Sequence, residues 1–292
     1  MFRVILWTML ACITPFASGC VHPKEKITKD VKYGEKPRNT LDLYLPENPI
    51  GAPVVVFVHG GRWYRNDKSQ IKLYDRIEAL NNAGFAIASI NYTYSSEALW
   101  PAQLDDTLSA IDFISEQAGA YGYDGDRIGI WGQSSGAHMI LMALAADAER
   151  ANPKVDAAVS WYAPTDLYNI AADRDADNVP GGNERFGEPT PESLLVGAAV
   201  PENKTKADKA SPVFRFASLS AAVDLPPILL VHGDSDFVIS PLQSERLFRT
   251  IKSREKSSDI KLRLVSGGKH GGEMFENEVS VVVDFFITHL RE

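Results

Sequence analysis

The chain has 292 residues, of which 45% are apolar and 23% charged, and its formal net charge is −8 at pH 7. These proportions are ordinary for a globular protein with one large hydrophobic core. The negative charge and the lack of a Lys/Arg-rich tract argue against a nucleic-acid partner and against electrostatic docking on anionic lipid, because both would require a basic face.

The first twenty residues have the order of an export signal. Arg3 precedes an apolar run over residues 4–13, and small residues come directly before Cys20. The run is too short to span a membrane as a helix. Small residues followed by cysteine resemble the lipobox of bacterial lipoproteins, in which the cysteine is acylated, although Ala17 stands where that motif usually has leucine. We therefore expect residues 1–19 to be a lipoprotein-type signal peptide and Cys20 to be lipidated; the alternative is an ordinary signal that leaves Cys20 free.

The rest of the chain is expected to form one domain. Residues 20–32 are polar and rich in lysine, and are interpreted as a tether between an anchor and a domain that spans residues 33–292. Within it, residues 171–212 are too long for a plain connection and are expected to form a partial lid over the site. The predicted location is an exported protein, anchored by lipid on the periplasmic or cell-surface side of a membrane and contacting the membrane only through that anchor.

From about residue 40 onward, strand-like and helix-like stretches alternate. Apolar β-branched runs predict strands at residues 41–45, 54–58, 86–90, 127–131, 155–161, 228–231 and 262–265. The first of these alternates apolar and polar residues, which predicts an antiparallel strand with one open face. Apolar residues at helical spacing predict helices at residues 101–117, 135–148, 241–251 and 273–290. This alternation predicts an α/β fold with a mostly parallel sheet flanked by helices, in which ligands bind at the carboxyl ends of the strands.

A candidate nucleophile lies directly after the predicted strand 127–131. Residues 132–136 read GQSSG and open an apolar helix. A serine on such a tight strand-to-helix turn has strained backbone angles, and side chains at the two glycines would collide with the neighbouring strand and helix. This context favours Ser134 as a nucleophile, with the N–H of Ser135 available to a bound oxyanion.

A serine of ordinary pKa needs a base, and the base needs a carboxylate to orient it. His270 lies in a loop with four glycines after the strand 262–265, and is the predicted base. Asp236 follows the preceding strand and is the predicted acid, with Asp234 and Asp166 as alternatives. The order Ser, Asp, His along the chain agrees with that of α/β-hydrolases. The other histidines are less suitable: His22, His59, His138, His232 and His289.

A glycine-rich turn follows the strand 54–58 and reads HGGRW from residue 59. Without a Cβ in the way, backbone N–H groups in such a turn can face a developing oxyanion. We assign the oxyanion donors as the N–H groups of Gly61, Arg62 and Ser135. Trp63 and Tyr64 are candidates for the substrate-binding wall, with packing of the loop as the equal alternative.

At these residues the chain resembles the α/β-hydrolase superfamily. More narrowly, it is similar to bacterial esterases and lipases with a His-Gly-Gly-x-Trp oxyanion loop, of the hormone-sensitive-lipase-like and feruloyl-esterase-like kinds. The resemblance covers the chain from about Tyr33 onward. It implies hydrolysis of small or medium acyl esters, with a small-molecule ester as substrate, no cofactor and no metal. The alternatives are an amidase or peptidase that uses the same triad, and a lipid-anchored binding module with a dead site.

Overall fold

The computed structural model describes residues 26–177, 189–254 and 259–291. The predicted signal peptide (1–19), Cys20 and the central part of the predicted lid (178–188) lie outside the described residues.

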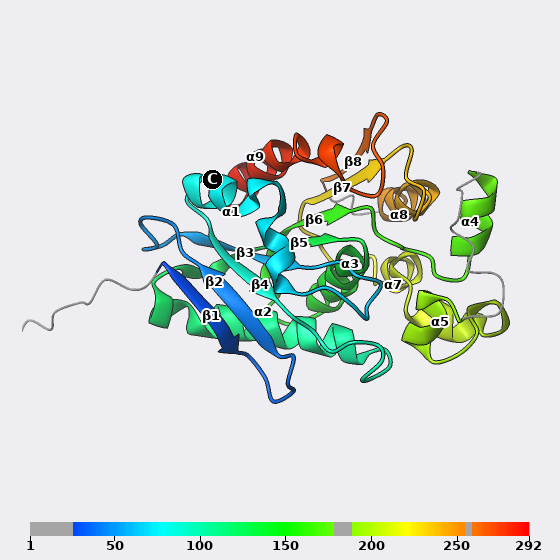
Figure 1. Cartoon of the computed structure of the whole chain (residues 1–292), viewed down its shortest axis with the longest axis horizontal. Coiled ribbons are helices and arrows are strands. Elements are labelled where there is room, and N and C mark those ends of the chain that lie inside the picture. Colours follow the sequence, from blue (N-terminus) through cyan, green and yellow to red (C-terminus); the bar gives the residue numbers. More distant parts are fainter. Residues whose placement is uncertain (1–25, 178–188, 255–258, 292) are drawn as a thin grey trace, which may run out of the picture.

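The described residues form one eight-stranded sheet with the strand order β1-β2-β4-β3-β5-β6-β7-β8 (Figure 1). The first two strands pair antiparallel with their neighbours, and all later pairings are parallel. The prediction of a mostly parallel α/β sheet is therefore confirmed. The strands are β1 (Ile27–Lys32), β2 (Thr40–Tyr44), β3 (Pro53–Val58), β4 (Ala86–Ile90), β5 (Asp124–Gln133), β6 (Val155–Trp161), β7 (Ile228–Gly233) and β8 (Ile260–Val265).

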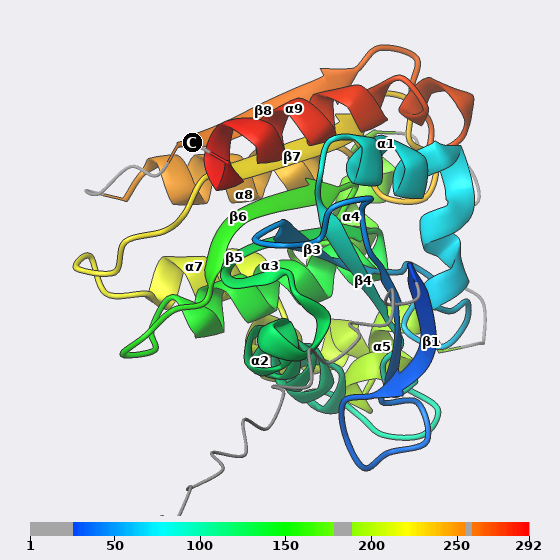
Figure 2. The ribbon, with the colours of Figure 1, turned by 90° about the vertical axis from the view of Figure 1, so that its left-hand side faces the viewer.

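Helices cover both faces of this sheet (Figure 2). One face carries α1 (Arg76–Asn82) and α9 (Glu278–Leu290), while α2 (Ala102–Tyr121), α3 (Ser135–Asp147), α7 (Pro212–Ser218) and α8 (Leu242–Lys252) lie on the other. Shorter helices complete the chain: η1 (Lys68–Asp75), α4 (Ile170–Ala176), α5 (Pro191–Val196), η2 (Val200–Glu202), α6 (Lys204–Lys209) and η3 (Glu273–Phe275). No helix among the described residues is both long and apolar enough to cross a bilayer.

The continuous apolar run of β3 follows from this two-sided cover. Val54, Val56 and Val58 are fully buried in the core beneath α2 and α3. Val55 and Phe57 point the other way, into a second core beneath α1 and α9. Because successive side chains of a strand alternate between its faces, a strand covered on both sides has no polar position.

The domain begins earlier in the chain than the sequence indicates. The predicted tether over residues 20–32 is wrong for its last six residues, because Ile27–Lys32 form β1 and pair with β2. Most positions of β1 are exposed to solvent, so this edge strand carries polar side chains and lacks the apolar pattern that identifies an inner strand.

Two further predictions need correction. All five residues of β2 are buried, so this strand has no open face. Its polar residue, Asp42, accepts a hydrogen bond from Lys68 Nζ at 2.5 Å and one from the backbone N–H of Asp30 at 3.0 Å, which satisfies the carboxylate inside the protein. The single helix predicted over residues 273–290 is divided into η3 and α9.

Phe286 tests the packing of α9 on the sheet. Its side chain is fully buried, and its ring lies so close to Gly129 of β5 that a Cβ there would be 2.7 Å from it. Phe286→Ala should lower the free energy of unfolding by about 3–5 kcal/mol through lost burial and the cavity left behind. Denaturant unfolding measures this loss. Ile50→Ala, at a position 82% exposed, should change it by less than about 0.5 kcal/mol; equal effects of the two substitutions would contradict the packing described here.

Candidate active site

Ser134 lies on the turn between β5 and α3 and has a strained backbone, with φ 53° and ψ −125°. Its N–H donates to the carbonyl of Trp161 in β6 at 2.9 Å, which fixes the turn against the sheet. A Cβ at Gly136 would lie 2.1 Å from the carbonyl oxygen of Val58 in β3, and one at Gly132 would lie 2.5 Å from that of Gly136. The glycines therefore let the helix begin in contact with the strands, as the sequence pattern predicts.

The structure brings together the three residues predicted to act with one another. His270 Nε2 lies 2.9 Å from Ser134 Oγ, and His270 Nδ1 lies 2.7 Å from Asp236 Oδ2. Since the carboxylate can only accept, Nδ1 carries the proton and Nε2 is left to accept the proton of the hydroxyl. This tautomer is the one that a general base for serine requires.

The Asp236 carboxylate accepts hydrogen bonds from the backbone as well as from His270. Its Oδ1 accepts hydrogen bonds from the backbone N–H groups of Val238 at 2.7 Å and Ile239 at 3.0 Å. Burial disfavours the charged form, but the opposing interactions with His270 and His232 outweigh it and hold the pKa of the Asp236 carboxyl below its usual range. The acid is therefore ionised at neutral pH.

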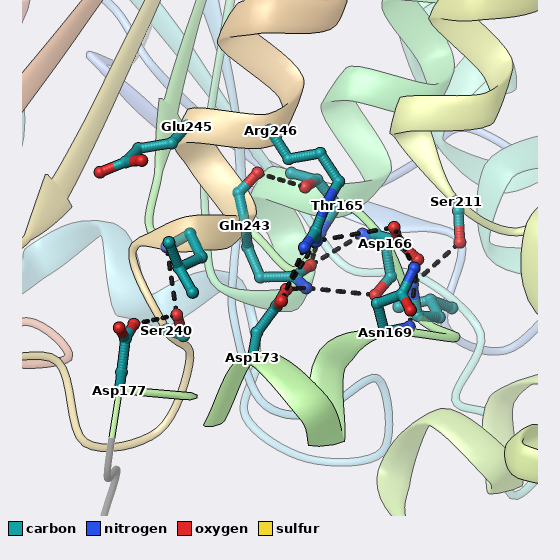
Figure 3. Close-up of polar contacts among 12 residues, drawn as sticks. Thr165, Asp166, Asn169, Asp173, Asp177, Ser211, Ser240, Gln243, Glu245 and Arg246 are labelled. Atoms are coloured by element: carbon teal, nitrogen blue, oxygen red, sulfur yellow. Dashed lines mark hydrogen bonds and ion pairs between the residues drawn. The ribbon is translucent and has the colours of Figure 1, made fainter. Parts of the chain in front are cut away.

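The alternative acids have other roles. Asp234 Oδ1 accepts from the N–H of Gly267 at 2.8 Å and from Ser235 Oγ at 3.0 Å, so its side chain holds the turn after β7. Asp166 caps the turn before α4, where its two oxygens accept from the backbone N–H of Asn169 at 3.1 Å and its side-chain amide at 2.8 Å (Figure 3).

Three other histidines are buried and serve to brace loops. His59 bonds the carbonyl of Gly60 at 2.8 Å through Nδ1 and stacks on Tyr92, with ring centroids 4.3 Å apart. His232 contacts the carbonyl of Ile239 at 3.0 Å and lies 3.4 Å from Asp236 Oδ2, so it supports the acid's loop. His138 Nε2 lies 2.6 Å from the carbonyl oxygen of Ala210. Burial lowers the pKa of His59 and of His138 to about 4.

The turn after β3 lies beside Ser134. Gly61, Arg62 and Ser135 all line the cavity that contains Ser134 and His270. Within the described part of the chain, the backbone N–H groups of Gly61 and Ser135 donate to no protein acceptor. Donors left unpaired in this position are free to meet an oxyanion.

The same turn has an unusual backbone. Gly61 has φ 136°, and a Cβ there would lie 2.0 Å from the carbonyl oxygen of Arg65. Arg62 and Trp63 follow with φ 55° and 62°, a left-handed conformation that side chains other than glycine adopt at a cost. Gly60, which comes before these residues, is fixed by a hydrogen bond: its N–H donates to Gln70 Oε1 at 2.7 Å.

The cavity above Ser134 has a volume of about 420 Å³. Trp63 is among the residues that line it, whereas Tyr64 is not among the described lining residues. The prediction for Tyr64 is therefore not supported. Its N–H donates to the carbonyl of Gly61 at 3.2 Å, although the next two residues, Arg65 and Asn66, line the cavity.

Part of the predicted lid forms a wall of this cavity. Thr190, Pro191 and Glu192 at the start of α5 line it, as does Arg174 of α4. Arg174 Nη2 lies 3.1 Å from Glu192 Oε1, and both side chains are nearly inaccessible to solvent. Arg174 Nε also donates to the carbonyl of Val238 at 2.8 Å, directly beside the loop of the acid. The wall is therefore polar and joined to the triad.

Several residues that shape the site lack any motif in the sequence. Tyr162 follows β6 and places its ring against that of His270, with centroids 4.5 Å apart. Gln243 of α8 accepts from the N–H groups of Thr165 and Asp166, each at 2.7 Å, and donates to Asp173 at 2.5 Å (Figure 3). These contacts join segments far apart in the chain, and only their position at the strand ends could have indicated them.

No group of three or more His, Cys, Asp or Glu side chains with the spacing of a metal site occurs among the described residues.

A mostly parallel sheet with a serine on the strand-to-helix turn defines the chain as an α/β-hydrolase of the esterase type. Residues 41–251 match the model of the BD-FAE family, and the chain belongs to that family. The resemblance found in the sequence is thereby confirmed.

Curated relatives are similar over most of this chain. A probable isoprenylcysteine alpha-carbonyl methylesterase of Oryza sativa subsp. japonica is 31% identical over 240 residues, which cover 80% of this chain and 55% of the relative. Esterase LipQ of Mycobacterium tuberculosis is 32% identical over 229 residues, with 74% and 51% covered. The chain thus spans about half the length of these two relatives.

A solved structure covers nearly the whole of both chains. It is described as a truncated form of a carbohydrate esterase from gut microbiota, and it matches with a TM-score of 0.78 and 26% identity. The match covers 92% of this chain and 97% of that one.

The two histidines with lowered pKa make folding sensitive to mild acid. The unfolded chain binds a proton at each of them near pH 6.5, whereas the folded protein does so only near pH 4, so stability falls as pH drops through this window. His59→Phe should reduce the difference in unfolding free energy between pH 7.5 and pH 5.0 by roughly 2 kcal/mol. Denaturant titrations at the two pH values measure it. Tyr92→Phe, which keeps the ring next to His59, should leave the difference unchanged, and an unchanged difference in His59→Phe would contradict the assignment.

Proposed function

We propose that this protein is a serine carboxylesterase that hydrolyses small or medium acyl esters through an acyl-enzyme. The observation that carries the proposal is the chain of hydrogen bonds from Asp236 through His270 to Ser134, which opens onto a cavity at the carboxyl ends of the strands. The two curated relatives and the solved structure named above are esterases by their descriptions, which favours esters over amides as substrates.

The first half of the reaction forms the acyl-enzyme. His270 Nε2 takes the proton of Ser134 Oγ as this oxygen attacks the carbonyl carbon of the ester. The negative charge that develops on the carbonyl oxygen is stabilised by the N–H groups of Gly61, Arg62 and Ser135. The imidazolium then gives its proton to the alcohol oxygen as the bond between this oxygen and the acyl carbon breaks.

The second half is the same sequence with water as the nucleophile. His270 takes a proton from water, the resulting hydroxide attacks the acyl carbon, and Ser134 leaves with the proton returned to it. Asp236 keeps Nδ1 protonated in both halves and stabilises the imidazolium each time it forms. Its ionised state and its fixed orientation, held by Val238 and Ile239, suit it to this role.

The cavity limits the substrate. A volume of about 420 Å³ has room for a short acyl chain and a modest alcohol. We propose hydroxylated alcohols, such as those of carbohydrate esters, as substrates, because the solved structure described as a carbohydrate esterase covers 92% of this chain at 26% identity.

Substitutions of the triad test this proposal on purified protein. Ser134→Ala should lower kcat for p-nitrophenyl acetate by on the order of a million-fold. Asp236→Asn should lower it by on the order of ten-thousand-fold, because the amide favours the wrong imidazole tautomer. Asp234→Asn, two residues away, is the matched control and should stay within a few-fold of the parent.

Hydrolysis of acetanilide at a rate above that of the ester would instead assign the triad to amides. No Ser134-dependent activity, together with no fluorophosphonate adduct on Ser134, would favour a binding module.

We further propose export and lipid anchoring through Cys20, supported by the order of residues in the first twenty positions. When the full chain is produced in a bacterium with a lipoprotein pathway, labelled palmitate should enter the protein, and the protein should sediment with membranes. Cys20→Ser should abolish both. Cys12→Ser, within the predicted signal, is the control and should change neither; labelling that survives in Cys20→Ser would refute the anchor.

A further inference from the structure

Trp63 directly follows the oxyanion donors Gly61 and Arg62, and is held through both its side chain and its backbone. Its indole Nε1–H donates to His138 Nδ1 at 3.2 Å, and its backbone carbonyl accepts from the N–H of Ser95 at 2.9 Å. Its ring is 2% exposed. A bulky residue keeps left-handed backbone angles only where its surroundings fix it in several ways. These contacts therefore help to hold the turn in shape, together with the bond from Gly60 to Gln70.

His138 is fully buried in the first turn of α3, four residues after Ser134. Its backbone N–H donates to the carbonyl of Ser134 at 3.0 Å, and its Nε2 lies 2.6 Å from the carbonyl oxygen of Ala210. A carbonyl can only accept and an indole N–H can only donate. The two partners therefore fix one neutral tautomer, with the proton on Nε2.

The imidazole of His138 thus joins three parts of the site. It is carried by the helix of the nucleophile, it holds Trp63 of the oxyanion turn, and it bonds Ala210 between α6 and α7. The rings of Trp63 and Trp100 both meet it edge-on, with centroids 5.2 Å and 5.1 Å away, so it cannot tilt without disturbing them.

We propose that His138 is a positioning residue for the oxyanion hole: through the indole of Trp63 it keeps the N–H groups of Gly61 and Arg62 directed at the oxyanion. The inference rests on the proposed esterase function. His138 touches neither the substrate nor the triad side chains in this scheme, and it acts through Trp63. Since the oxyanion exists only in the transition state and the intermediates, loss of this support lowers kcat rather than substrate binding.

The hydrogen bond is tested by removing one partner at a time. Trp63→Phe keeps an aromatic ring but has no N–H, and should lower kcat for p-nitrophenyl acetate by about tenfold to a hundredfold. This is less than the roughly hundredfold to thousandfold loss on removing a donor, because the donors remain but are less well directed. KM should change by less than about threefold. The inhibition constant of a trifluoromethyl ketone, whose adduct with Ser134 carries the oxyanion, should rise by the same factor as kcat/KM falls.

Variants at His138 distinguish the effect on kcat of losing the hydrogen bond from the effect of changing the volume of the side chain. His138→Leu offers no acceptor and should lose as much kcat as Trp63→Phe. The side-chain oxygen in His138→Asn reaches about the position of Nδ1 and should restore kcat to within a few-fold of the parent. The double variant Trp63→Phe, His138→Leu should be no worse than either single variant, because both remove the same interaction.

Trp131 provides the matched control for the aromatic substitution. Its side chain is fully buried, but its indole N–H has no partner in the described structure. Trp131→Phe should therefore keep kcat within about twofold. If His138→Leu fails to fold, Trp63→Phe and His138→Asn still decide the question.

The outcomes separate this inference from the proposed function. A parent protein without Ser134-dependent esterase activity refutes the function and the inference together. An active parent whose Trp63→Phe variant keeps its kcat, or loses kcat no more than Trp131→Phe does, refutes the role of His138 alone. Additive losses in the double variant would also refute it.

Discussion

The contact between the start of α3 and the end of β3 is the constraint on which the rest of the site depends. Only a hydrogen atom fits at Gly136 beside the carbonyl of Val58, so the first turn of the helix sits directly against the strand. That approach places Ser134 next to the turn that follows the same strand, and the nucleophile and the oxyanion donors become neighbours although more than 70 residues separate them in the chain. A methyl group at this position would push the two apart, and the hydroxyl would then attack without electrostatic support.

The acid and the outer wall are joined by polar contacts rather than by an apolar core. Val238 is the link: its N–H donates to Asp236, and its carbonyl accepts from Arg174 of α4. Asp173, the neighbour of Arg174, binds Arg246 of α8 through two contacts of 2.6 Å each (Figure 3). Buried polar groups are costly unless they are paired, and paired ones tolerate little change in geometry. The wall of the cavity formed by α4 and α5 is therefore fixed in position relative to the Asp236 carboxylate.

Local patterns in the sequence were enough to predict the inner strands and the three residues of the triad, because each of these residues lies within a few positions of the end of a strand with a clear apolar pattern. They were not enough for β1, whose exposed position at the edge removes the pattern. Asp42 led to the wrong prediction of an open face on β2. A buried carboxylate that is paired with lysine cannot be distinguished in the sequence from a carboxylate that faces solvent. The bond between Trp63 and His138 could not be predicted either, because it joins residues 75 positions apart that belong to no common motif.

Among the described residues, β1 and β8 are the two edge strands of the sheet, and both carry charge. β8 exposes Lys261 and Arg263 along one edge, and β1 places Lys29, Asp30 and Lys32 along the other. An unpaired strand is a template on which another polypeptide can add by backbone hydrogen bonding, with aggregation as the result. At the β8 edge, Lys261 is paired with Asp259 and Arg263 with Glu278 of α9, so a strand added there would have to accommodate both ion pairs. Charged side chains on an edge strand make it a poor template for such addition.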